Sequence, residues 1–300
     1  MLIEQKLQKI INAINLNNHF NNIFFTKRAS FGLYAILKAY SLNKKNPRVA
    51  IPGIVCPDVL LSVIKARCIP YFCDVNLSNG IIKKSEIDKA VKKGIKVFII
   101  VNLYGNSFNF NSITHLIKNK NYLIINDCAQ SLGSKFKNRY THLYGDVSLI
   151  SFGKSKQING GGGLLLINSK KLSLDCEKIL NKNNLKINSK KSSYNFKLNF
   201  YNNKILFIKN NDRHCFNGTY DKYLKNYFKI YDRKINFDKN LKLLLNLESS
   251  KKEKFVKINN IKRILPKKIK LISKNSQSNP WRLTIRLNNI NFHKQKYFIT

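Results

Sequence analysis

From residue 49 to residue 168, the sequence alternates short apolar runs with amphipathic stretches. The runs are rich in Val, Ile and Leu, which is typical of strands covered on both faces. Strands are predicted at 49–52, 71–75, 97–103, 122–127, 146–152 and 163–168. Helices are predicted between them at 57–68, 85–94 and 112–120, the second closed by Gly94. Strands that alternate with helices predict an α/β fold with a mostly parallel central sheet flanked by helices.

Outside this region the pattern changes. Apolar positions 3, 7, 10, 11 and 14 predict an N-terminal helix rather than a secretion signal. No apolar run approaches the ~18 residues that span a bilayer, so we expect a cytoplasmic protein without a membrane partner. Segment 181–213 is rich in Asn and Lys and predicts an irregular insertion, whereas 240–265 predicts a helix and PWRLTIRL (280–287) a strand.

These changes of pattern divide the chain into two parts. Residues 1–235 are expected to form a large α/β domain that holds the functional site. Residues 236–300 are expected to form a short and apparently incomplete C-terminal α+β domain.

The charge of the chain is strongly basic. Its 300 residues include 55 Lys and Arg against 15 Asp and Glu, a net charge of +40. Such a charge favours a polyanion-binding protein. The excess is almost all lysine, however, and comes with many Asn, Ile, Phe and Tyr residues, which share A/T-rich codons. Since no zinc-finger, RNP or helix-turn-helix motif accompanies the charge, we expect no specific nucleic-acid partner and keep polyanion binding as an alternative.

The six cysteines stand at 56, 68, 73, 128, 176 and 215. They include no CxxC pair and no Cys/His set at zinc spacing, so no metal site is predicted. Their scattered positions fit reduced thiols of a cytosolic protein better than a disulfide framework.

One stretch in the middle of the chain carries the residues best suited to chemistry. Asp127 closes an apolar strand, and ligands of open α/β sheets bind at the carboxyl ends of strands. Gln130 follows on the turn, a second strand ends at Ser151, and Lys156 precedes the glycines of 160–163. A lysine can form a Schiff base with pyridoxal phosphate, and a buried carboxylate can keep the pyridine nitrogen protonated. A serine hydroxyl and backbone N–H groups can hold the phosphate.

Each of these residues also has a plain structural interpretation. Asp127 would cap the next helix, and the glycines would form a hairpin turn. Lys156 is one lysine among many. The spacing of the residues together, rather than any single residue, favours the cofactor hypothesis.

The same stretch resembles the signature region of the DegT/DnrJ/EryC1/StrS family, sugar aminotransferases with the type I fold of pyridoxal-phosphate enzymes. That family shows Glu-Asp-x-Ala-Gln at a strand end, then Gly-Asp, Ser-Phe-x-x-x-Lys and a Gly-Gly pair. This chain has four such elements in the same order, Asn126-Asp127-Cys128-Ala129-Gln130, Gly145-Asp146, Ser151-Phe152…Lys156 and Gly162-Gly163. Further matches are Pro70, Phe72 and Asp74, and VNLYGN (101–106) resembles the family's Leu-Tyr-Gly element.

The resemblance implies a role for each residue of the stretch. Lys156 would form the Schiff base and shuttle the proton between amino donor and acceptor. Asp127 would pair with the pyridinium nitrogen. Gln130 would lie beside the ring and its phenolic oxygen, and Ser151 would bind the phosphate.

Two further positions complete the implied cofactor site. The family's Ser-Gly-Thr phosphate loop corresponds to Arg28-Ala29-Ser30, where Ser30 would supply a hydroxyl and the helix start, including Ala29, its backbone N–H groups. Alternatively, Ser30 is an ordinary N-cap. Cys56 stands where many relatives stack an aromatic side chain on the cofactor ring, so we expect weaker cofactor binding.

The resemblance therefore implies a pyridoxal-phosphate-dependent aminotransferase. It would transfer an amino group from glutamate to a nucleotide-linked keto-sugar, as a cytoplasmic homodimer, in polysaccharide or lipopolysaccharide biosynthesis. Lys156 argues against the family's dehydratases, which have histidine at that position. Relatives continue past a strand like the one at 280–287. This shortness and Cys56 favour a first alternative, a catalytically impaired relative with a structural or interaction role.

Overall fold

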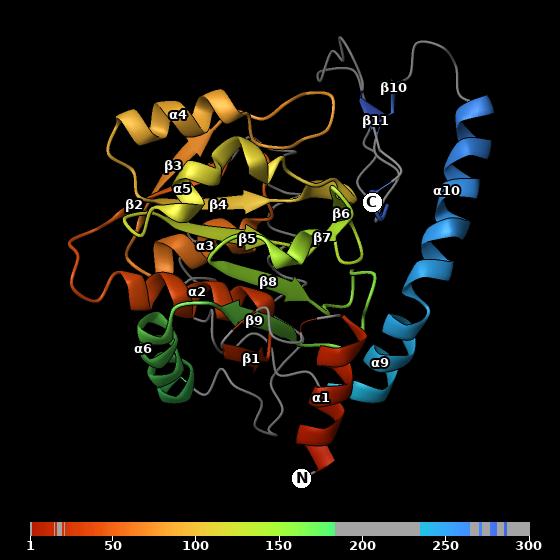
Figure 1. Ribbon diagram of the computed structural model, residues 1–300, viewed down its shortest axis with the longest axis horizontal. Helices are drawn as coiled ribbons and strands as arrows, with labels where there is room; N and C mark the ends of the chain where they lie inside the picture. Colours follow the sequence, from red (N-terminus) through yellow and green to blue (C-terminus); the bar gives the residue numbers. More distant parts are fainter. Residues whose placement is uncertain are drawn as a thin grey trace, which may run out of the picture.

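The computed structural model describes residues 2–14, 16, 20, 22–183, 235–264, 270–271, 277–280 and 285–286. A seven-stranded sheet lies at its centre, with the strand order β1-β9-β8-β5-β4-β2-β3 (Figure 1). Its strands are β1 (Asn22–Thr26), β2 (Arg48–Pro52), β3 (Ile69–Cys73), β4 (Val97–Val101), β5 (Leu123–Asp127), β8 (Val147–Ser151) and β9 (Gly163–Ile167). The helices before and between these strands are α1 (Leu2–Ala13), α2 (Ala29–Tyr40), α3 (Pro57–Lys65), α4 (Lys84–Lys92) and α5 (Thr114–Lys118). After β9 comes α6 (Lys170–Lys182).

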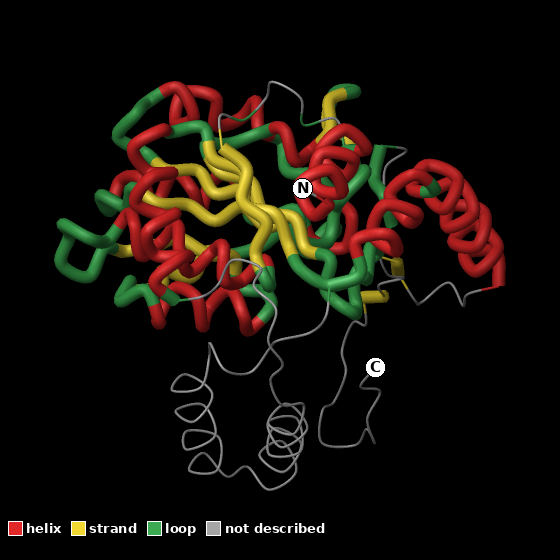
Figure 2. The backbone as a smooth tube through the Cα atoms, turned by 90° about the horizontal axis from the view of Figure 1, so that it is seen from below, coloured by secondary structure: helices red, strands yellow, loops and turns green. Residues whose placement is uncertain are grey.

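Most of the sheet is parallel, as predicted. Strands β3, β2, β4, β5 and β8 run in one direction, and β9 and β1 pair antiparallel at one side. The helices lie on both sides of the sheet (Figure 2). Each predicted strand is present, although β3 begins and ends two residues earlier than predicted. The pattern did not predict β1, because its short NIFFT run takes strand geometry from its distant partner β9.

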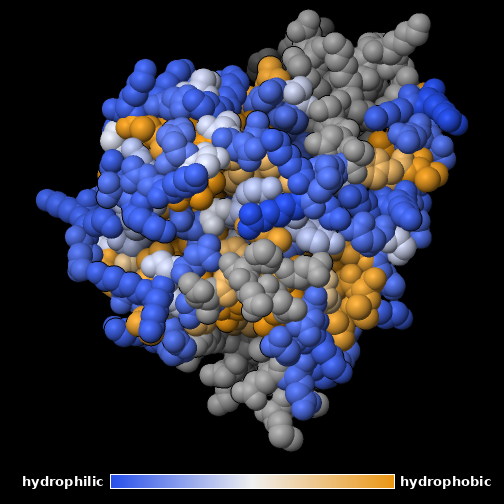
Figure 3. Space-filling view, viewed as in Figure 1, coloured by the Kyte–Doolittle hydropathy of each residue, from blue (hydrophilic) through white to orange (hydrophobic). Residues whose placement is uncertain are grey.

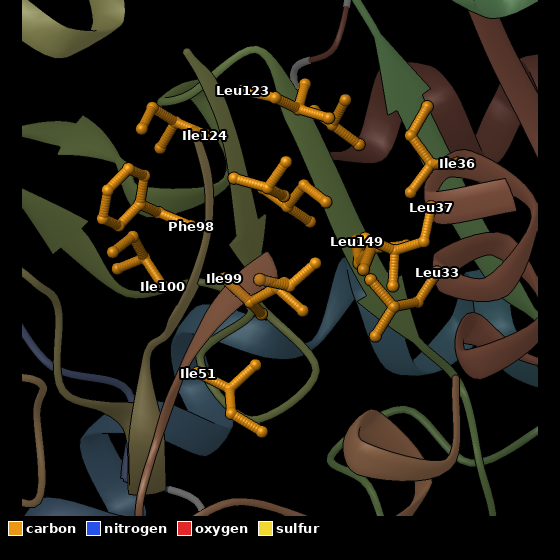
Figure 4. Packing of buried hydrophobic residues seen from close by; sticks show 14 of the residues in the cluster. Leu33, Ile36, Leu37, Ile51, Phe98, Ile99, Ile100, Leu123, Ile124 and Leu149 are labelled. Atoms are coloured by element: carbon orange, nitrogen blue, oxygen red, sulfur yellow. The ribbon is translucent and has the colours of Figure 1, made fainter. Parts of the chain in front are cut away.

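The core forms where α2 packs on β8 and β9. Leu33 and Leu37 of α2 lie beside Leu149 of β8 (Figure 4). A Cβ atom at Gly32 would lie only 3.1 Å from the Cβ atom of Leu165, so glycine lets the helix approach the sheet closely. The alternate residues of β8 and β9 face a second buried cluster, which includes α1. The middle of the sheet is therefore covered on both faces, which explains why its strands β4, β5, β8 and β9 are mostly apolar.

The described C-terminal residues form two helices and two short strands. The single helix predicted at 240–265 is instead α9 (Phe237–Leu245) followed by α10 (Leu247–Ile264). Asn246, a weak helix former, ends α9, and Leu247 lies against Gly133. Strand β10 (Lys270–Leu271) pairs antiparallel with β11 (Ile285–Arg286).

Two predictions fall largely outside the described residues. Of the strand predicted at 280–287, only residues 280 and 285–286 are described. Of the irregular segment predicted at 181–213, only the first three residues are described, at the end of α6. The division into domains at residue 235 stays a prediction.

The five described cysteines are free thiols. Four are buried, and burial raises the pKa of Cys68 to about 11 and those of Cys73 and Cys128 to about 12. Cys56 is exposed, and Cys215 lies outside the described residues. A separate finding is that no described helix is long and apolar enough to cross a membrane.

Two phenylalanines test how the sheet stabilises the fold. Phe98 on β4 is fully buried, whereas Phe72 on β3 is 55% exposed. Phe98→Ala is expected to lower the free energy of unfolding by about 3–5 kcal/mol, because it leaves a cavity in the core. Phe72→Ala is the matched control and should cost about 1 kcal/mol or less. Urea unfolding measures both values, and equal losses would contradict this account of the core.

Candidate active site

A cavity of about 590 Å³ opens at the carboxyl ends of the parallel strands. Its floor includes the last residues of three strands, Val101, Asp127 and Ser151. Val101 and Asp127 are paired in the sheet, so their strands end at the same level. The first turns of α2 and α3 supply further walls. The cavity brings together every site residue that the sequence predicts, namely Ala29, Ser30, Cys56, Asp127, Gln130, Ser151 and Lys156.

Asp127 is a buried carboxyl group at the end of β5. Its Oδ1 atom accepts a hydrogen bond from the backbone N–H of Ala129, 2.9 Å away. Burial raises the pKa of Asp127, while this N–H and the nearby ammonium of Lys156 act in the opposite direction. The helix-cap interpretation is wrong, because residues 128–134 form turns rather than a helix. Burial thus makes the charged form of Asp127 unfavourable, and a cationic group bound in the cavity would stabilise it.

Lys156 lies on the loop that joins β8 to β9. Phe152 closes this loop with Gly162, since its N–H donates to the Gly162 carbonyl at 2.9 Å and its own carbonyl accepts from Gly161 at 2.7 Å. The glycines therefore do not form a tight hairpin turn by themselves, because they lie at the end of the long loop of the β8–β9 hairpin and Gly163 is the first residue of β9. The same loop places the half-buried Lys156 at the cavity.

The glycines serve close packing within the chain. A Cβ atom at Gly160 would overlap the Asn240 side chain of α9. A Cβ atom at Gly163 would overlap the backbone of Ala29 at the start of α2. Gly162, with φ of +88°, has no room for a side chain beside Phe25. The glycine run thereby lets the loop, α2 and α9 meet.

Two polar side chains of the cavity are oriented by backbone groups. The Ser151 hydroxyl oxygen accepts from the Gly153 N–H at 3.3 Å, so its hydrogen can be donated to a ligand. The Gln130 Oε1 atom accepts from the Tyr104 N–H at 3.1 Å. This contact occupies the carbonyl end of the Gln130 amide and leaves its Nε2 end as the donor for a ligand.

The first turn of α2 contributes positive potential. Arg28 occupies the N-cap position, so Ser30 lies inside the first turn and its N-cap interpretation is wrong. The Arg28 guanidinium forms an ion pair with Asp58 in the first turn of α3, and Lys27 also lines the cavity. The N-terminus of a helix favours an anion, because its backbone N–H groups carry partial positive charge.

Cys56 is the N-cap residue of α3 and lines the cavity. Its surface is exposed to solvent, yet protein surrounds the thiol closely enough that desolvation raises its pKa. The carboxylate of Asp58 acts in the same direction and the ammonium of Lys156 against it. Cys56 therefore stays a small neutral group in this wall.

Two residues of the family-like motifs have structural roles. Asn126 stands where the family has Glu, and its Nδ2 atom donates to the carbonyls of Thr141 and Tyr144. Asp146 accepts from the Ile124 N–H at 2.8 Å and braces β5. The sequence pattern did not predict the ion pair between Arg28 and Asp58, because the two residues lie 30 positions apart and no local pattern links them.

The comparisons with known proteins agree with this geometry. Residues 24–209 match the model of the DegT/DnrJ/EryC1/StrS aminotransferase family. The chain belongs to this family. GDP-perosamine synthase of Escherichia coli O157:H7 is 28% identical over 167 residues, which cover 55% of this chain and 46% of the synthase. The chain spans less than half the length of the curated relatives it matches.

Solved structures show the same fold. The E. coli GDP-4-keto-6-deoxy-D-mannose-3-dehydratase with bound hydrated PLP has a TM-score of 0.67 at 14% identity, over 97% of this chain and 72% of the dehydratase chain. A family aminotransferase from Brucella abortus has a TM-score of 0.64 at 16% identity, over 95% and 70% of the two chains. The expected fold of PLP-dependent aminotransferases is thus confirmed. Pyridoxal phosphate is the cofactor of this family.

The residues of the cavity fit this cofactor. Its phosphate needs hydrogen-bond donors and positive potential, which Ser30, Ser151 and the N-terminus of α2 supply. Its ring nitrogen needs a carboxylate and its aldehyde an amine, and the cavity offers those groups in Asp127 and Lys156. None of the described residues that line the cavity is aromatic, so they offer no aromatic surface for the cofactor ring.

Asp127→Asn is expected to stabilise the cofactor-free chain at neutral pH. Burial raises the carboxyl pKa above its usual 3.8, so the folded state holds the proton more readily than the unfolded state. The stability contributed by Asp127 is present below the unfolded pKa and is lost as the pH rises through the folded pKa. Asn keeps an oxygen for the Ala129 N–H and carries no charge.

Denaturant unfolding of both proteins from about pH 4 to pH 8 measures this effect. The advantage of the variant should grow as the pH rises. A variant that is less stable than the wild type at every pH would show that Asp127 is stabilised by partners rather than strained by burial.

Proposed function

We propose that this chain binds pyridoxal phosphate in the cavity and transfers an amino group to a nucleotide-linked keto-sugar. One observation carries the proposal, namely that Lys156, Asp127, Ser151 and Ser30 come from separate parts of the chain and line one cavity. Family membership and the relative named GDP-perosamine synthase support it.

Each residue would hold one part of the cofactor. Ser30 and Ser151 would donate to the phosphate beside the N-terminus of α2. Asp127 would be stabilised in its charged form next to the ring nitrogen, because an opposite charge favours the carboxylate. The Nε2 atom of Gln130 would donate a hydrogen bond to the phenolic oxygen of the cofactor ring.

When bound, pyridoxal phosphate supplies a carbonyl carbon that accepts amines and a ring that withdraws electrons. The Nζ atom of Lys156 would hold the cofactor in the resting enzyme and then, as a free amine, move a proton between donor and acceptor carbons. The carboxylate of Asp127 would keep the ring nitrogen protonated throughout. The half-buried position of Lys156 on a closed loop would keep its amine at one place for both tasks.

The finer points of the proposal come from the resemblance. Glutamate would be the amino donor, and the product would serve polysaccharide or lipopolysaccharide biosynthesis. The chain would act in the cytoplasm as a homodimer. We also keep the proposed division into domains 1–235 and 236–300, although the Asn236 N–H donates to the Gly160 carbonyl across it.

Cofactor attachment at Lys156 is the direct test. The purified chain mixed with pyridoxal phosphate is expected to absorb near ~420 nm, and borohydride should abolish the band and fix a label on Lys156. Lys156→Arg should remove both band and label. Lys154→Arg is the matched control, since Lys154 is an exposed lysine on the same loop, and it should keep both.

Three outcomes separate the hypotheses. A label on Lys156 with turnover of a nucleotide keto-sugar supports the proposal. A label without turnover favours the catalytically impaired relative, which the absence of an aromatic side chain at Cys56 suggests. A label on other lysines alone, or none, contradicts the proposed site.

The net charge of +40 favours polyanion binding as a second candidate function. On the face seen in Figure 3, hydrophilic residues are spread widely rather than gathered in one strip. We therefore expect duplex DNA to bind weakly, without sequence preference, and to dissociate by roughly 200 mM salt, because counterion release alone drives it. Fluorescence anisotropy with two unrelated duplexes measures this. Tight binding to one duplex at that salt would favour the second candidate.

A further inference from the structure

The loop that carries Lys156 is held by residues from much later in the sequence. Asn240 on α9 is fully buried. Its Oδ1 atom accepts from the Gly160 N–H at 2.8 Å, and its Nδ2 atom donates to the Gly161 carbonyl at 3.1 Å. Asn236 adds a backbone bond, donating to the Gly160 carbonyl at 2.7 Å. One neutral amide thus satisfies two consecutive backbone groups at the end of the loop.

A second buried asparagine reaches the middle of the loop. The carbonyl oxygen of Asn279 accepts from Nε2 of Gln157, the residue after Lys156, at 3.1 Å. Asn279 is itself fixed, because its N–H donates to the Ser134 hydroxyl at 2.8 Å and its Nδ2 atom donates to the Leu132 carbonyl at 2.7 Å.

Asn279 can pack in its position only because two neighbouring residues, Gly105 and Gly133, have no side chain. A Cβ atom at Gly105 would overlap the Asn279 backbone, and one at Gly133 would crowd the Asn279 side chain. Both glycines have positive φ, +89° and +79°, which other residues adopt only with strain. The contact therefore requires a specific backbone conformation at Gly105 and Gly133, next to a fixed position of Asn279.

We propose that Asn240 and Asn279 are positioning residues, which hold the loop of residues 153–162 and thereby place Lys156 at the carboxyl edge of the sheet. The catalytic meaning of that placement rests on the proposed function. A reacting group displaced by about 1 Å can lose about 100-fold in rate, so a loop fixed at its middle and its end matters for an amine that must serve two carbons.

Amine acylation tests the placement without any cofactor. Lys154 and Lys156 lie on the same loop, the first exposed and the second half-buried. The acylation rate of Lys156 divided by that of Lys154 therefore reports how firmly the loop holds Lys156. Mass spectrometry after brief treatment with an acetylating reagent gives this ratio. In Asn240→Ala we expect the ratio to rise about threefold or more towards one, as local opening exposes Lys156.

Two further variants separate positioning from general loss of stability. Gln157→Leu removes only the donor to Asn279 and should raise the ratio with little change in melting temperature. Ser41→Ala is the control, because it removes a buried hydroxyl that bonds the Ala66 carbonyl at the far end of α2. It should lower the melting temperature and leave the ratio unchanged. An unchanged ratio in both loop variants, or an equal rise in the control, would overturn the proposal.

Borohydride labelling with pyridoxal phosphate adds the functional readout. In the loop variants we expect label at Lys156 to fall about tenfold relative to the wild type, and kcat to fall more than KM changes. If the wild type takes no label at Lys156, the proposed function fails while the acylation ratio still decides the positioning role. If wild type and loop variants take equal label with equal kcat, the positioning role in catalysis is wrong and the proposed function stands.

Discussion

The close packing of α2 on β8 and β9 is the contact on which the site depends. Gly32 lets the middle of the helix approach Leu165, and Gly163 lets its first residue, Ala29, approach the start of β9. A backbone bridge between Arg28 and Gly162 fixes the same end. The N-terminus of α2 is thereby directed at the carboxyl edge of the sheet, where its partial positive charge faces the same cavity as Asp127. The position of α2 therefore determines both the packing of this part of the core and the positive potential at the cavity.

Three of the chain's few acidic residues lie in or near the cavity. Only 15 acidic residues stand against 55 basic ones, yet three of them shape the site region. Asp127 lines the cavity, Asp58 holds the guanidinium of Arg28, and Asp146 braces β5. Cys56 adds no charge, because its raised pKa keeps the thiol protonated. A protonated thiol is a poor nucleophile, so Cys56 would not compete with Lys156 for the carbonyl carbon of the proposed cofactor.

The sequence pattern predicted the parallel strands and placed Asp127, Gln130, Ser151 and Lys156 at strand ends and loops, because both depend on local order, whereas Ala29, Ser30 and Cys56 were implied only by the family resemblance. Apolar runs that are buried on both faces predict strands. Asp127 and Ser151 end two of these strands, and Lys156 lies five residues after Ser151. Contacts between distant segments left no such signal. The strand β1 exists through its pairing with β9, and the break at Asn246 accompanies the packing of Leu247 on Gly133. The alternative that Ser30 is an N-cap is wrong, because Arg28, two residues earlier, takes the N-cap position and α2 begins at Ala29.

The two asparagine contacts of the loop also constrain the order in which the molecule can be completed. Asn240 lies 80 residues beyond Gly160, and Asn279 lies 122 residues beyond Gln157. During synthesis the sheet and α2 can form while Asn240 and Asn279 are still inside the ribosome, because all strands of the sheet and α2 lie before residue 168. The loop with Lys156 receives its last hydrogen bonds only when the chain has passed residue 279. A nascent chain of this protein can therefore form its central sheet before the loop with Lys156 is held in place.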